Sequence, residues 1–171
     1  GLSETAIKEK TLAQLLKLEK QFNFKQGQLA KKASDLAKKR ADKEVEQRKK
    51  LAAIKLEIMK GDVEERIAKN EGEIKSESIL LERKIELIKK NQALRLQLLN
   101  AEETAKRQII SQSDDLASVK KAESEKIKEE FRRRREQNEK ESVNRIAKAR
   151  EIDTKKRNKQ ERENFESHLS Q

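Results

Sequence analysis

The side chains with the clearest capacity for chemistry are basic ones, gathered in two runs in the C-terminal part of the chain. The runs contain Arg132, Arg133, Arg134 and Arg135, and then Lys155, Lys156, Arg157 and Lys159. Clustered guanidinium and ammonium groups neutralise phosphates, and such contacts bind polyanions without sequence preference. Together with a net charge of +11, the runs form a candidate anion-binding surface for nucleic acid or another anionic surface.

Acidic neighbours can pair with these basic runs on the surface of a helix. Six pairs place the acid four residues before the base, which is the better orientation for a helical ion pair. They are Glu129–Arg133, Glu130–Arg134, Glu136–Lys140, Glu141–Arg145, Glu151–Lys155 and Asp153–Arg157. The aromatic side chains that stack on single-stranded bases are also missing between the basic residues. We therefore favour a solvated, ion-paired helix over nucleic-acid binding, which remains the alternative.

Residues that could perform catalysis are scarce. His168 is the only histidine and lies in a polar stretch next to the C-terminus, cysteine is absent, and the four glycines form no phosphate-binding loop. Aspartate and glutamate are abundant, but on a solvated helix nothing raises a carboxyl pKa or excludes water. The sequence predicts no catalytic residue, no cofactor, no metal site and no small-molecule substrate, and hence no enzyme.

The composition predicts helix throughout. The 171 residues include no proline, and 44% of them are charged. Proline is the strongest helix breaker, and the remaining residues are mostly good helix formers. Only four aromatic side chains, all phenylalanine, are available to a compact core. The predicted fold class is therefore all-α, with long helices in place of a globular core.

The apolar residues favour a repeat of eleven over one of seven. Ala30, Ala41, Ala52, Val63, Ile74, Ile85 and Leu96 follow one another in steps of eleven. Eleven residues in three turns predict helices that are nearly straight or slightly right-handed. We expect an oligomer seam of apolar residues, made by Val63, Ile67, Ile74, Leu81, Ile85, Ile88, Leu96 and Leu99. The expected partner is a second or third copy of the chain, or another helical protein.

Two architectures are compatible with this pattern. The favoured one is a single elongated region, 1–171, in which a very long, nearly continuous helix forms an extended coiled coil. Hinges are predicted at 60–72, which contains two glycines, and at 111–115, which is rich in serine and aspartate. The alternative is an antiparallel three-helix bundle that turns at these hinges. Segment 132–171 has few apolar residues, so we expect it to be a highly charged, solvated helix, which favours the extended form.

These expectations favour a structural or spacer role, in which a coiled-coil protein or fragment self-associates and scaffolds partners. In composition the chain resembles helical segments of phage tail tape-measure proteins, myosin-like rods and filament spacers, and the first likeness implies a ruler or filler in a tubular assembly. The likeness carries over no functional position. The leucine-rich stretch 12–18 could lie on a membrane surface, but oligomer contact is the favoured interpretation. We expect a soluble intracellular protein, cytoplasmic by default or part of a virion or other assembly.

Overall fold

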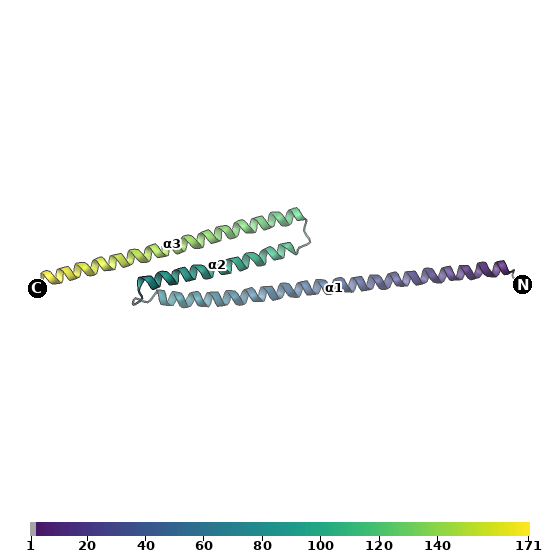
Figure 1. Cartoon of the computed structure of the whole chain (residues 1–171), viewed down its shortest axis with the longest axis horizontal. Helices are drawn as coiled ribbons and strands as arrows, with labels where there is room; N and C mark the ends of the chain where they lie inside the picture. The colour runs from purple at the N-terminus through teal and green to yellow at the C-terminus, as the bar shows by residue number, and fades with distance from the viewer. Residues whose placement is uncertain (1–2) are drawn as a thin grey trace. The chain divides into compact units, whose positions relative to one another are not determined.

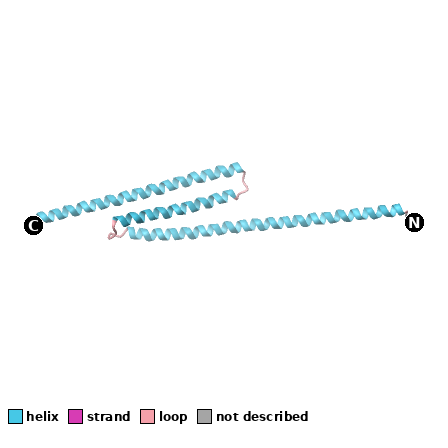
Figure 2. Cartoon of the chain, viewed as in Figure 1, coloured by secondary structure: helices cyan, strands magenta, loops and turns pink. Residues whose placement is uncertain are grey.

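The computed structural model describes residues 3–171, and this range is helical without a strand (Figure 2). The helices are α1 (Glu4–Ile74), α2 (Leu81–Ser111) and α3 (Ala117–Leu169). At the start of α1, the Ser3 hydroxyl accepts a hydrogen bond of 3.2 Å from the Ala6 backbone N–H, as an N-terminal capping residue does. The predicted all-α class is confirmed.

The chain divides into two compact units, Gly1–Lys50 and Leu51–Gln171, and the boundary lies within α1. In the first unit, every residue from Ser3 to Lys50 is exposed except Ala6, which is half-buried. This part of the helix therefore contributes no core of its own.

The second unit contains residues 51–74 of α1 together with α2 and α3. The chain reverses at residues 75–80 and again at 112–116, so that α2 runs antiparallel to the end of α1 and α3 runs antiparallel to α2 (Figure 1). Ion pairs connect α2 with α3, with Arg135 bonded to Glu103 at 2.6 Å and Lys106 to Glu130 at 3.8 Å. The second unit is thus a three-helix arrangement with short connections.

The favoured prediction of one nearly continuous helix is not what the structure shows, and the antiparallel alternative fits it. The second turn overlaps the predicted hinge at 111–115, whereas the first turn lies at 75–80 and not at 60–72. Gly61 and Gly72 lie inside α1 without a positive φ. One helical glycine costs only about 1 kcal/mol relative to alanine, which packing nearby offsets. Helix α1 instead ends just before Ser76 and Ser78, whose hydroxyl oxygens lie 3.0 Å apart in the turn. Serine side chains in this setting compete with the helix for backbone hydrogen bonds.

The apolar core of the second unit lies beside the first turn. Ile74, Leu87 and Ile88 form one buried cluster, and Ile79 and Ile146 pack against it. Each such side chain stabilises the fold by about 1.5–3 kcal/mol when fully buried. Because these residues come from the first turn and from all three helices, this small core holds the helices together.

Segment 132–171, for which a solvated helix was expected, has two different parts. From residue 154 to the C-terminus every residue is exposed. Upstream, Asn138, Ser142 and Ala149 are buried along one side of α3. The side of α3 that lies in the unit therefore includes two polar residues, Asn138 and Ser142, beside the apolar Ile146 and Ala149.

Candidate functional site

The arginines of the run 132–135 are each paired with carboxylates. The pairs are Arg132 with Glu129 at 2.6 Å and with Glu136, Arg133 with Glu129 at 3.3 Å, Arg134 with Glu130 at 2.6 Å and Glu102 at 3.7 Å, and Arg135 with Glu103 at 2.6 Å. The hydrogen bond from Arg132 lowers the pKa of Glu129 to about 2, so that this carboxylate stays ionised. The run is therefore largely neutralised by its own chain.

The second basic run is more accessible. Lys155 pairs with Glu151 at 3.0 Å and Arg157 with Asp153 at 3.1 Å, while Lys159 lies 3.9 Å from Glu163 and Lys156 is exposed. The paired basic side chains are 68–78% exposed. Such surface pairs contribute at most about 1 kcal/mol, so an incoming anion can compete with them.

Most of the predicted oligomer-seam residues are covered within the chain itself. Val63, Ile74 and Ile88 are buried, and the structure brings Ile74 and Ile88 into one cluster. The half-buried members are Ile67, Leu81, Ile85 and Leu99, whereas Leu96 is exposed. Because α2 and α3 fold back, these residues have less surface left to offer another chain.

A polar junction joins the three helices next to this core. Asn91 of α2 is fully buried, and its side chain donates to Glu71 at 2.9 Å and accepts from Asn70 at 2.7 Å. Glu71 of α1 also accepts two hydrogen bonds from Arg145 of α3, at 2.5 and 2.8 Å. The Arg145 hydrogen bonds, its positive charge and the Asn91 hydrogen bond lower the pKa of Glu71 despite burial. The junction is therefore an ionised, hydrogen-bonded network that fixes how the helices meet.

Sequence reasoning missed this junction because its partners are far apart in the chain and are not apolar. One local signal was available: Asn91 follows Ile88 by three residues and Leu87 by four, so it lies on their buried face. A polar residue at such a position often fixes the register of packed helices.

Helix α3 packs on α2 through positions with coiled-coil spacing. Phe131, Asn138, Ser142 and Ala149 are buried and follow one another at intervals of seven, four and seven residues. The Phe131 ring is fully buried, with the Lys106 ammonium 5.3 Å and the Arg134 guanidinium 5.0 Å from its centroid. This aromatic side chain is the largest fully buried one in the described residues.

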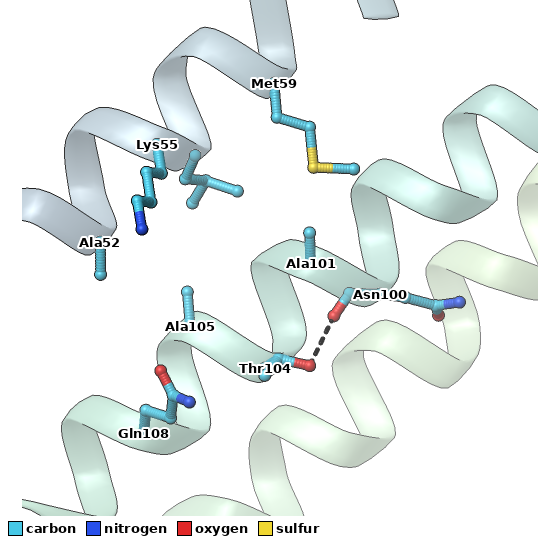
Figure 3. Close-up of a pocket in the computed structure, with 9 residues that line it drawn as sticks. Ala52, Lys55, Met59, Asn100, Ala101, Thr104, Ala105 and Gln108 are labelled. Atoms are coloured by element: carbon cyan, nitrogen blue, oxygen red, sulfur yellow. Dashed lines mark hydrogen bonds between the residues drawn. The ribbon is translucent and has the colours of Figure 1, made fainter.

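An open groove of about 450 Å³ lies between residues 52–59 of α1 and 100–108 of α2 (Figure 3). Its walls are mainly small or apolar and include Ala52, Leu56, Met59, Ala101 and Ala105. The Thr104 hydroxyl donates to the Asn100 carbonyl within α2 at 2.9 Å. The groove therefore brings together no acid and base for chemistry and resembles a packing surface.

The first unit presents a row of exposed apolar side chains on α1. At about 100° per residue, they fall within an arc of about 80° and form what we call the N-terminal stripe. The stripe consists of Ile7, Leu15, Leu18, Phe22, Leu29 and Leu36, which are 51–65% exposed. The spacing of seven from Leu15 to Leu36 is that of a helix–helix seam.

No protein family matches the chain, and no curated protein or solved structure is detectably similar to it. Within residues 3–171, no cluster of three or more histidine or carboxylate side chains could hold a metal ion. None of the helices described in this range is long and apolar enough to cross a membrane.

Proposed function

We propose that the chain is a structural assembly protein. In this role the second unit is a folded helical module, and the first unit is an association helix. The observation that carries the proposal is the N-terminal stripe, six large apolar side chains that are more than half exposed. Burying each fully is worth about 1.5–3 kcal/mol, and an extended exposed apolar surface is typical of an interaction site.

The charges of the second unit also support a structural role. The carboxylate of Glu71 is held by Arg145 and Asn91, and Glu103 is held by Arg135. These groups join helices and do not face an enclosed cavity. Their arrangement favours holding the module in one register over moving protons.

We expect the full chain to be a dimer or trimer at tens of micromolar, because association buries the apolar side chains of the N-terminal stripe between the copies. Size exclusion coupled to light scattering measures the mass directly, and circular dichroism checks that the chain is helical. A helical monomer at this concentration would contradict the proposed function.

Anion binding is a second candidate, supported by the exposure of Lys155, Arg157 and Lys159. Because the run 132–135 is neutralised by glutamates, we expect only weak binding to nonspecific duplex DNA, lost between about 50 and 200 mM salt. A fluorescence-anisotropy titration at several salt concentrations tests this. Micromolar or tighter affinity at physiological salt would instead make polyanion binding the main function.

A further inference from the structure

The N-terminal stripe has two unlike flanks. Counting about 100° per residue, Lys25, Lys32 and Lys39 lie together along one side of it. Ala30, Ala37 and Glu44 lie along the other side, each five residues after one of the lysines. All six residues are exposed. Between residues 25 and 44, the stripe therefore has one edge of lysines and an opposite edge of alanines, Gln26 and Glu44, while Arg40 lies within the arc beyond the last leucine.

We propose that the N-terminal stripe packs against the same stripe of a second copy of this chain, in a parallel, in-register, two-stranded coiled coil. This inference rests on the proposed function and names its partner and orientation. Leu15, Phe22, Leu29 and Leu36 each meet their own counterpart, forming successive layers of the seam. Leucine repeated every seven residues is the pattern that two-stranded coils use.

The flanks decide the orientation. In a parallel coil, each edge of one helix faces the opposite edge of its partner, and contacts join residues five apart in sequence. Lys25 and Lys32 then lie over alanines, and Lys39 lies beside Glu44 of the second copy. In an antiparallel coil each edge faces its own counterpart, and pairing Leu15 with Leu36 then sets Lys25 against Lys25 of the second copy, which is unfavourable. The net charge of the chain ends does not distinguish the parallel from the antiparallel orientation, because both ends are basic.

The stripe also has enough surface for a stable pair. Its five large side chains from Leu15 to Leu36 have roughly 100 Å² each to bury. Two copies therefore bury about 1,000 Å², before the lysine stems and alanines beside the seam are counted, which reaches the size expected of a biological interface.

The chain has no cysteine, so single cysteines report the pairing without background. Leu15 and Ala33 lie within the arc of the stripe, whereas Ser34 lies about 140° from its centre. Under mild oxidation of the full chain, we expect Leu15→Cys and Ala33→Cys each to give interchain disulfides, at least fivefold faster than Ser34→Cys. In an antiparallel coil, a residue faces its own copy only where the two-fold axis crosses the coil. Two positions this far apart in sequence cannot both lie there, so an antiparallel coil cannot link both. The inference would be overturned if only one of the two positions, or neither, formed an interchain disulfide. It would also be overturned if Ser34→Cys formed one at the same rate as the other two.

A second pair of variants tests the face independently. Phe22→Glu, in the stripe, is expected to reduce the mass by light scattering to that of a monomer. Phe24→Glu, a matched substitution on the far side of the same helix, is expected to leave it unchanged. An oligomer that survives Phe22→Glu would overturn the inference and leave the proposed function standing, whereas a monomeric unmodified chain would remove both. A monomer that binds phosphatidylserine vesicles through the stripe would assign the surface to a membrane and also overturn the inference.

Discussion

Replacing Phe131 with alanine is expected to destabilise the second unit by about 3–5 kcal/mol. The ring is fully buried where α3 packs on α2, so its removal leaves a cavity between the helices. Lys106 and Arg134 lie over the ring and would also lose a favourable contact between their charges and its face. Since the apolar core of this unit is small, the loss is a large part of its stability.

Urea denaturation followed by circular dichroism measures this loss, and hydrogen exchange locates it in α2 and α3. Phe165→Ala is the matched control, because Phe165 lies on the same helix and is 65% exposed. Its free energy of unfolding should stay within about 0.5 kcal/mol of that of the unmodified chain. Equal destabilisation by the two substitutions would contradict the packing of Phe131 between the helices.

The helical class could be predicted because helix propensity is local. The absence of proline and the excess of lysine, glutamate, leucine and alanine act on each segment independently of its neighbours in space. The serines and aspartates near residue 112 likewise compete with helix through their own side chains, and the second turn overlaps the segment that they predicted. The first turn was misplaced because glycine is only a weak helix breaker. Gly61 lies beside the buried Val63, and Gly72 beside the buried Ile74, so packing holds the helix through both.

The ion pairs show the same division between local and distant causes. Pairs that depend only on helical spacing were predicted, such as Glu130 with Arg134 and Asp153 with Arg157. Arg145, predicted to pair with Glu141, instead pairs with Glu71 of another helix. That choice depends on how α3 lies against α1, which no local pattern determines. For the same reason, the pattern did not show that Val63, Ile74 and Ile88, predicted to lie in an oligomer seam, are buried within this chain. The oligomer seam itself stays a prediction.

Replacing Ile88 with aspartate is the substitution expected to damage the second unit most. Ile88 is buried with Ile74 and Leu87 at the point where the three helices meet. The aspartate removes this apolar contact and places a carboxylate in the core without a cationic partner. The combined cost is on the order of 4 kcal/mol or more, which is enough to unfold a unit of ordinary stability.

The matched control for Ile88→Asp is Val143→Asp, because Val143 is 59% exposed on α3 and its carboxylate would stay in water. We expect Val143→Asp to change the free energy of unfolding by no more than about 0.5 kcal/mol. Hydrogen exchange should show fast amides throughout 63–100 in Ile88→Asp and slow ones in the control, since slow exchange requires the packed core. If Ile88→Asp keeps slow exchange in this segment, the cluster at the first turn is not what holds the three helices together. The stability would then have to come from the contacts between α2 and α3 around Phe131. In that case Phe131→Ala would lower the free energy of unfolding more than Ile88→Asp does.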